Sequence, residues 1–238
     1  MLNLVENIQC SFLPGKFNPF EKTPELYNKA YHSWKNTWGK IFSDAGSPDS
    51  LNVENFLRQN VVVTLHHRNE VIGLVTATFF NLTSDVSVQH PYLKPFPSKM
   101  TTLLTESKSG MYMTGEYLAV HPDYRKSKLG VSLSEVLIGL IQKIFTLSQA
   151  QILFGTAVRP KKVHESCFGY GYQECGAFEK YGLDCVLLFN TQANVREHEN
   201  PEIRDLINFF WNHRSDFTIL KTLPQFDENH FIETQTAA

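Results

Sequence analysis

The feature that most constrains the fold is one apolar helix placed between two strands. Residues 133–147 carry apolar side chains at three- and four-residue spacing, which predicts a helix with a wide buried face. The segments Met111–Val120 before it and Ile152–Val158 after it are typical of strands. Because strand–helix–strand connections cross over with one hand, these two strands are expected to be parallel neighbours. The chain is therefore predicted to have an α/β fold.

Hairpins are predicted on both sides of this unit. Residues 61–66 and 71–80 flank a polar turn, and residues 177–181 and 183–189 form a closing hairpin. The spacing of apolar residues predicts helices over 24–42, 53–59 and 161–170. Two helices therefore precede the first strand that the pattern supports, which is 61–66.

Two further segments bear on the organisation of the chain. The connection 83–110 holds three prolines and is too long for an ordinary loop, so it is predicted to be a functional loop or lid. Asn200 and Pro201 start a last amphipathic helix, and a polar tail from Asp227 is expected to be frayed. We expect one domain over 1–189 with its core in 52–189, and a C-terminal extension over 190–238 packed on it.

Composition excludes several classes of protein. Hydrophobic residues make up 42% of the chain, enough for a core, and the formal net charge of -2 lacks the basic excess of a nucleic-acid binder. The four cysteines form no Cys-x-x-Cys pair and no His stands at zinc spacing, so neither a metal site nor a disulfide framework is indicated. A reducing cytoplasm fits this pattern. No secretion signal or membrane span is expected, because no window approaches about 18 consecutive apolar residues.

The best candidate for a binding site is the basic turn between strand 111–120 and helix 133–147. Backbone N–H groups at the start of a helix point outward and attract anions such as a pyrophosphate. Arg125, Lys126 and Lys128 add positive charge, and Gly130 lacks a Cβ that would keep phosphate away from the backbone. The pattern predicts a nucleotide-type phosphate loop, and a solvated basic turn is the alternative.

The segment from Gly115 to Gly130 resembles motif A of the GCN5-related N-acetyltransferases (GNATs). The family pattern is Leu-x-Val-x-Pro-x-x-Arg leading into Arg/Gln-x-x-Gly-x-Gly/Ala, and this chain matches its last Gly but has Lys128 at the first. The matching residues are Leu118-Ala-Val120, Pro122, Tyr124-Arg125 and Arg125-Lys-Ser-Lys-Leu-Gly130. Asn69-Glu-Val-Ile-Gly-Leu-Val-Thr76 is similar to the second and third strands of the family, and Gly171-Tyr172 to its Gly-Phe pair. The likeness covers roughly residues 52–189.

The resemblance implies a mixed, twisted sheet flanked by helices, in which the parallel fourth and fifth strands, 111–120 and 152–158, splay apart. It implies an acyltransferase domain over 1–189 that uses acetyl-CoA or a longer acyl-CoA as co-substrate, without a metal. The pantetheine arm would lie in the splay and the pyrophosphate on the amides of 126–131. The donor-binding residues would be Leu118, Val120, Arg125, Lys126, Ser127, Lys128, Leu129, Gly130 and Val131.

Glu116 is the expected catalytic base. Direct attack on a thioester needs a neutral amine, and an alkyl ammonium is deprotonated only about one part in a thousand at neutral pH. Even spacing from Leu118 and Val120 would place all three side chains on one face that borders the splay. A glutamate that is exposed, or paired with Lys or Arg, is the alternative. The next candidates for the base are His121, His164 and Glu165.

The general acid is not assigned by the sequence. The position at which the family often has a Tyr is Cys167, which is predicted to be a small buried helix residue, and the nearest phenol, Tyr170, lies three residues away.

Three functions are compatible with the sequence. The first is a cytoplasmic N-acyltransferase that moves an acyl group from acyl-CoA to an amine by direct attack. The second is a long-chain enzyme like the N-acyl amino acid synthases and acyl-homoserine-lactone synthases, which take longer acyl chains, commonly from acyl carrier protein. Lys126, Lys128, Lys161 and Lys162 could meet an acidic carrier. Glu116-Tyr117 replaces the Ser-Arg pair of the lactone synthases, which disfavours lactone activity. The third is a non-catalytic acyl-CoA-binding protein.

Overall fold

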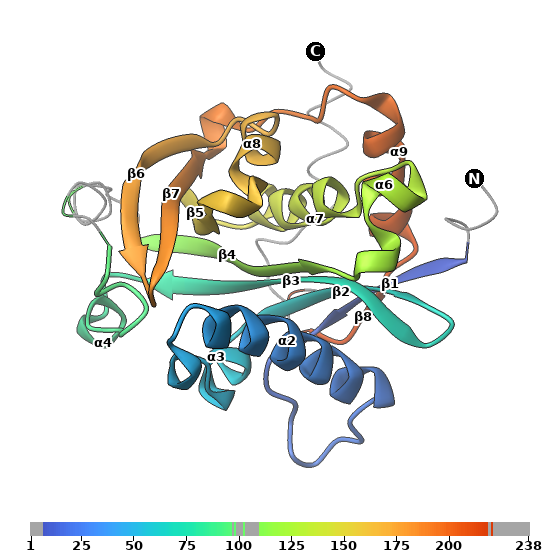
Figure 1. Cartoon of the computed structure of the whole chain (residues 1–238), viewed down its shortest axis with the longest axis horizontal. Coiled ribbons are helices and arrows are strands. Elements are labelled where there is room, and N and C mark those ends of the chain that lie inside the picture. Colours follow the sequence, from blue (N-terminus) through green and yellow to red (C-terminus); the bar gives the residue numbers. More distant parts are fainter. Residues whose placement is uncertain (1–6, 97, 99–101, 103–109, 219, 221–238) are drawn as a thin grey trace.

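A mixed sheet of eight strands forms the centre of the computed structural model, which describes residues 7–96, 98, 102, 110–218 and 220 (Figure 1). The order across the sheet is β6-β7-β5-β4-β3-β2-β1-β8. Neighbouring strands are antiparallel except for the parallel pairs β4–β5 and β1–β8. The strands are β1 (Ile8–Leu13), β2 (Val61–His67), β3 (Glu70–Asn81), β4 (Met111–Val120), β5 (Ile152–Val158), β6 (Gln173–Lys180), β7 (Leu183–Thr191) and β8 (Ser215–Asp216). The predicted mixed α/β sheet is confirmed.

Strand β1 shows that the prediction of two helices before the first strand was wrong. It pairs antiparallel with β2, from Ile8 opposite His67 to Leu13 opposite Val62. Every residue of β1 except Gln9 is buried. A strand buried on both faces lacks the polar–apolar alternation that marks a strand in a sequence. Because this alternation is missing, β1 is not predictable from the sequence.

Helices cover both faces of the sheet (Figure 1). On one face, α7 (Leu133–Leu147) packs against β3 and β4, and α9 (Pro201–Asn212) packs on α7. On the other face lie α2 (Glu25–Asp44) and α3 (Val53–Leu57). The shorter helices are α4 (Asp85–Val88), α6 (Lys126–Leu129) and α8 (Val163–Phe168), and single 3-10 turns cover 48–50, 122–124, 159–161 and 192–194.

Local sequence signals set the starts of the two long helices on the α7 face. The Ser132 hydroxyl accepts a hydrogen bond from the Glu135 amide and caps α7, and the Asn200 side chain accepts from the Glu202 amide ahead of α9. Pro201 stands at the first position of α9, as predicted. The polar tail predicted from Asp227 lies outside the described residues.

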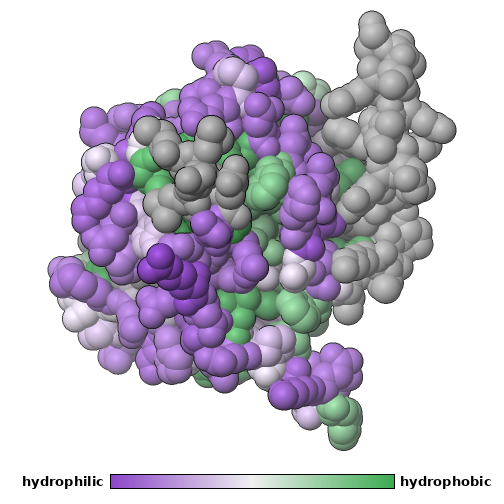
Figure 2. Space-filling model, turned by 90° about the vertical axis from the view of Figure 1, so that its right-hand side faces the viewer, coloured by the Kyte–Doolittle hydropathy of each residue, from purple (hydrophilic) through white to green (hydrophobic). Residues whose placement is uncertain are grey.

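The surface is mainly hydrophilic on the side seen in Figure 2, with apolar groups gathered near the middle of the view. Among the described residues, no helix combines the length and apolar character needed to cross a membrane.

The α2 face of the sheet has two separate covers. The first is α2 with α3, whose Trp34 and Phe56 pack on Val62 and Leu74. The second comes from the long β3–β4 connection, whose Tyr92 and Phe96 pack in a different cluster with Phe80, Tyr112, Ile152, Phe154, Cys175 and Leu187. A pocket between the two covers is lined by residues of α2, of this connection and of β4.

The parallel strands β4 and β5 part after three residue pairs, the last of which is Thr114 with Phe154. Glycines mark the point of separation, because a Cβ on Gly155 would lie 2.5 Å from the Gly115 carbonyl oxygen. Beyond it, β4 continues to Val120 alongside β3 only, and β5 continues to Val158 alongside β7 only. The splay predicted from the family resemblance is thus present.

Candidate functional site

A bulge in β4 determines which side chains near the splay lie on the α2 face of the sheet and which lie on the α7 face. Tyr117 and Leu118 together occupy the position opposite Val75 on β3, since the register shifts between Leu74 and Thr76. Tyr117 adopts a left-handed backbone conformation with φ of 55°. After the bulge, Tyr117 and Ala119 pack with the α2 cluster.

The expectation that Glu116, Leu118 and Val120 share one face is therefore wrong. Glu116 lies opposite Thr76, which lies opposite Val62 in the α2 cluster, whereas Leu118 and Val120 pack with the α7 cluster. The extra residue of the bulge reverses the alternation between Glu116 and Leu118.

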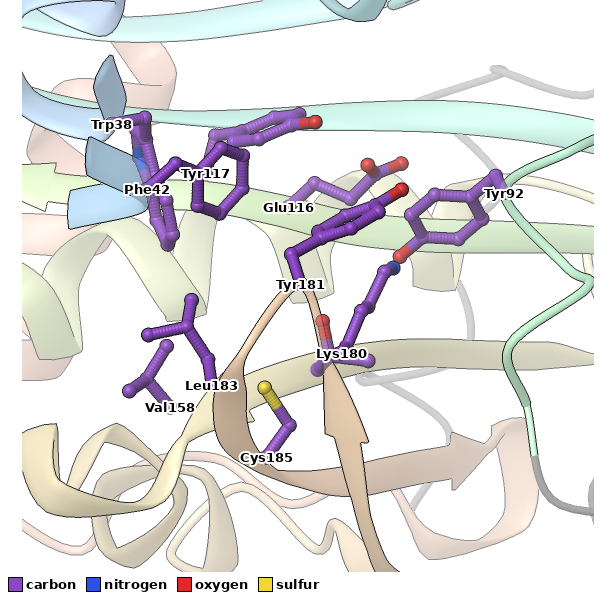
Figure 3. Close-up of a pocket in the computed structure, with 11 residues that line it drawn as sticks. Trp38, Phe42, Tyr92, Glu116, Tyr117, Val158, Lys180, Tyr181, Leu183 and Cys185 are labelled. Atoms are coloured by element: carbon purple, nitrogen blue, oxygen red, sulfur yellow. The ribbon is translucent and has the colours of Figure 1, made fainter. Parts of the chain in front are cut away.

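A pocket opens on the α2 face beside this bulge (Figure 3). The empty space in and at the mouth of this pocket is about 420 Å³, and this volume includes open solvent. Its walls come from α2, the connection after α4, β4, β5 and the β6–β7 hairpin. The lining residues are Trp38, Phe42, Tyr92, Glu116, Tyr117, Thr156, Val158, Lys180, Tyr181, Leu183 and Cys185. Most of this lining is aromatic or aliphatic, with one carboxylate and one ammonium.

Glu116 forms a buried ion pair with Arg58, the residue at the end of α3. Arg58 Nη1 donates to Glu116 Oε1 at 2.9 Å, and Nη2 donates to Oε2. The Thr114 hydroxyl donates to Oε1 at 2.7 Å. Burial alone would lower the pKa of Arg58, but the charge of Glu116 raises it above its usual value. The alternative of a paired glutamate is thus observed, and the same carboxylate lines the pocket.

Lys180, at the end of β6, is the second charged group of the pocket, and its side chain extends toward Tyr92 (Figure 3). Its Nζ lies 4.0 Å from the ring centroid of Tyr92 and 5.4 Å from that of Tyr181. Burial lowers the pKa of Lys180 to about 8, although Glu116 acts in the opposite direction. No pattern in the sequence selects Arg58 or Lys180, because each is brought to Glu116 only by the folding of distant segments.

The basic turn lies at the start of α7, where Leu129 and Val131 pack in the α7 cluster. It contains an additional helical turn, α6, in which the amides of Lys128, Leu129 and Gly130 donate to the carbonyls of Arg125 and Lys126. Gly130 ends α6 with φ of 81°, a left-handed conformation that favours glycine. Lys128 pairs with Asp123 on the surface. Three of the amides proposed for pyrophosphate therefore already have partners.

The other candidates for proton transfer lie elsewhere. His121, His164 and Glu165 are not among the residues that line the pocket. Cys167 is buried in α8, and burial raises the pKa of its thiol to about 12. The Tyr170 hydroxyl donates to the Glu135 carbonyl at 2.6 Å. No group of three or more His, Cys, Asp or Glu in the described part of the chain is placed to hold a metal ion.

Comparisons with known proteins rest on structure alone. No family model matches the sequence, and no curated protein matches it. FeeM, an N-acyl amino acid synthase from uncultured soil microbes, has a TM-score of 0.53 and 12% identity, covering 86% of this chain and 97% of FeeM. BjaI, a CoA-dependent acyl-homoserine lactone synthase, has a TM-score of 0.50 and 12% identity, covering 89% of this chain and 94% of BjaI.

A third similar structure is a yellow fever mosquito protein assigned as arylalkylamine N-acetyltransferase 7. It has a TM-score of 0.50 and 11% identity, covering 71% of this chain and 85% of the mosquito protein. At these identities the likeness concerns the fold. Together with the splayed parallel strands, these neighbours show that the chain has the fold of the GCN5-related N-acetyltransferases.

Proposed function

We propose that this protein is an N-acyltransferase that moves an acyl group from an acyl thioester to an amine by direct attack. The observation that supports this most directly is the pocket at the splay, which places the buried Glu116 beside strand edges that have lost their partners. The fold shared with acetyltransferases and acyl synthases supports an acyl transfer.

The donor would approach from the α7 face. Its pyrophosphate would bind at residues 125–131, through the Arg125 and Lys126 side chains and the amides that α6 does not use. Its pantetheine arm would lie along β4 near Leu118 and Val120, which pack on that face. A backbone N–H there would stabilise the oxyanion of the tetrahedral intermediate, a contribution of about 2.7 to 4 kcal/mol for one good donor.

The acceptor would approach from the α2 face and occupy the pocket. Its nitrogen attacks the thioester carbonyl carbon, its proton goes to Glu116 directly or through a water, and the sulfur leaves as thiolate. The Arg58 guanidinium occupies both oxygens of this carboxylate, so we propose that the acceptor's amine competes with Arg58 for it.

A second candidate is an enzyme that takes a longer acyl chain from acyl carrier protein to an amino acid. The long β3–β4 connection, which forms one pocket wall through Tyr92, and the similarity to FeeM favour it. Lys126 and Lys161 could contact an acidic carrier, but Lys128 pairs with Asp123 and Lys162 with Glu165. A non-catalytic acyl-CoA-binding protein is the third candidate.

One experiment separates the three. Purified protein is incubated with acetyl-, hexanoyl- and palmitoyl-CoA, or with acylated carrier protein, and with a panel of amines and amino acids. Mass spectrometry of the products identifies both the acyl group and the acceptor. Acylated product from CoA thioesters supports the proposal, and product from the carrier alone supports the second candidate. Binding of acyl-CoA without any product would support the third candidate instead.

A further inference from the structure

The pocket contains more positive than negative charge. Lys180 is 7% exposed, and the described residues give its ammonium aromatic contacts with Tyr92, Phe96 and Tyr181 but no salt bridge to a carboxylate. The nearby Arg58 and Glu116 neutralise each other through their paired hydrogen bonds. Burial keeps the neighbouring Cys185 thiol neutral by raising its pKa. The cluster therefore carries one excess positive charge.

Two polar groups of the same pocket also lack partners among the described residues. The Tyr92 hydroxyl and the Trp38 indole N–H are buried and form no hydrogen bond. Tyr92 is 6% exposed and its ring is contacted by both Arg58 and Lys180. A buried charge or polar group without a partner is costly, so the Lys180 ammonium and the neighbouring Tyr92 hydroxyl together favour binding of an anion that accepts hydrogen bonds.

The rest of the pocket limits what that anion can be attached to. Phe42, Val158 and Leu183 offer apolar surface, and Tyr117 and Tyr181 add aromatic faces. A ligand that fits has a small anionic group at Lys180 and an apolar or aromatic body along the pocket.

We propose that Lys180 and Tyr92 bind the carboxylate of the acceptor, which makes the acceptor an amino acid with an apolar or aromatic side chain. This rests on the proposed acyl transfer and specifies its substrate. The carboxylate is assigned to the acceptor, and not to the acyl group, because the pocket lies on the α2 face and the basic turn packs with the α7 cluster. The amine of the same molecule would then lie toward Glu116.

The test compares acceptors that differ only in the carboxylate, such as phenylalanine with phenethylamine and leucine with isoamylamine. The wild-type protein should favour the amino acid in kcat/KM by about a hundredfold or more, because an analogue without the carboxylate leaves the polar groups unpaired. Lys180→Met should abolish this preference by losing activity on the amino acid only. Tyr92→Phe should reduce it by about tenfold, and the exposed Lys40→Met should leave it unchanged.

A second set of assays varies the acyl donor and distinguishes a carboxylate on the acceptor from one on the acyl group. With phenethylamine as acceptor, succinyl- and butanoyl-CoA are compared, and a Lys180→Met effect confined to the succinyl donor would overturn the assignment to the acceptor. Equal wild-type activity on both members of each acceptor pair would overturn it as well, with acyl transfer intact. If no acceptor is acylated, the proposed function fails, and equilibrium titration of the same pairs decides whether Lys180 binds a carboxylate.

Discussion

Glu116 has both a structural contact and a proposed role in proton transfer. It is held by Arg58 and Thr114 and also faces the pocket, so a structural role and a catalytic role predict different responses to substitution. Because Glu116 is buried and Arg58 is largely so, breaking the pair by removing one of them typically costs about 3 to 5 kcal/mol of stability. Stability and rate must therefore be measured together.

Glu116→Gln should lower the maximal rate per folded molecule by about a hundredfold near neutral pH if the carboxylate accepts the acceptor's proton. Raising the pH should restore part of the rate, because the solution then supplies neutral amine. Arg58→Met removes the same ion pair but keeps the base, so it should lower the melting temperature and retain more activity than Glu116→Gln. The measurement is a pH–rate profile beside a thermal melt for each variant. Equal activity losses in both would remove Glu116 as the base.

Lys180 should make stability depend on pH in a particular direction. Its pKa in the folded protein is about 8, against 10.5 in the unfolded chain, so between these values the unfolded state binds more protons and stability rises with pH. The titratable groups facing it that enter this balance are Glu116, Arg58 and Cys185. Denaturant titrations give the free energy of unfolding of each protein. The value for Lys180→Met minus that for wild type should be about 3 kcal/mol larger at pH 7 than at pH 10.5. A constant difference across this range would contradict a buried charged Lys180.

Only part of the site is predictable from the sequence. Glu116 was identified because it lies on the predicted strand beside a recognisable turn. Arg58 and Lys180 are 58 and 64 positions away from it, and no local pattern connects such segments. The positions of Arg58 and Lys180 beside Glu116 depend on burial and charge pairing, which only the complete fold determines.

At the scale of elements, a substitution in the turn between β4 and α7 tests whether the acyl donor binds there. Gly130→Asp places a carboxylate beside the proposed pyrophosphate and should raise the KM for the acyl donor by tenfold or more. Gly130→Asn is the matched control, because asparagine has the same shape and a similar tolerance for the left-handed conformation found there. Steady-state kinetics with varied donor separates charge from backbone strain. An equal change in both variants would place the pyrophosphate elsewhere.

The start of the splay depends on the close approach of Gly155 to β4. A Cβ at this position meets the Gly115 carbonyl at 2.5 Å, so Gly155→Ala should destabilise the protein by about 1 to 3 kcal/mol. Gly39→Ala in α2 meets only Leu51 Cδ2 at 3.8 Å and should be neutral or stabilising, since alanine favours helix. Thermal melts of the two variants give the comparison. Unchanged stability of Gly155→Ala would show that the strands separate without needing this contact.

The element-level predictions succeeded where periodicity was strong and failed where it was interrupted. The helix 133–147 and the strands 111–120 and 152–158 have the predicted bounds. The bulge at Tyr117 was not predictable, because one extra residue leaves no signature in the hydrophobic pattern and yet reverses every side chain after it. β1 was missed because its burial on both faces removes the alternation.

For the whole molecule, binding of an acyl donor should be visible as stabilisation. At a concentration of about 100 dissociation constants, a CoA thioester should add roughly 2.7 kcal/mol, which for a chain of this length is about 5 to 10 °C in melting temperature. Thermal-shift profiles with acetyl, hexanoyl and palmitoyl thioesters measure this. A flat profile for all three would contradict the use of coenzyme A and leave the carrier-protein route.

The short ladder between β4 and β5 divides the sheet into two blocks, β6-β7-β5 and β4-β3-β2-β1-β8. Three residue pairs join the blocks, whereas eight join β3 to β4 and seven join β5 to β7. A small rigid-body rotation of one block against the other would therefore leave the longer ladders intact. Glu116 and Tyr117 belong to one block and Lys180 and Tyr181 to the other, so the angle between the blocks sets the width of the pocket. Substitutions at this border can thus alter which acceptor fits without touching a residue that lines the pocket.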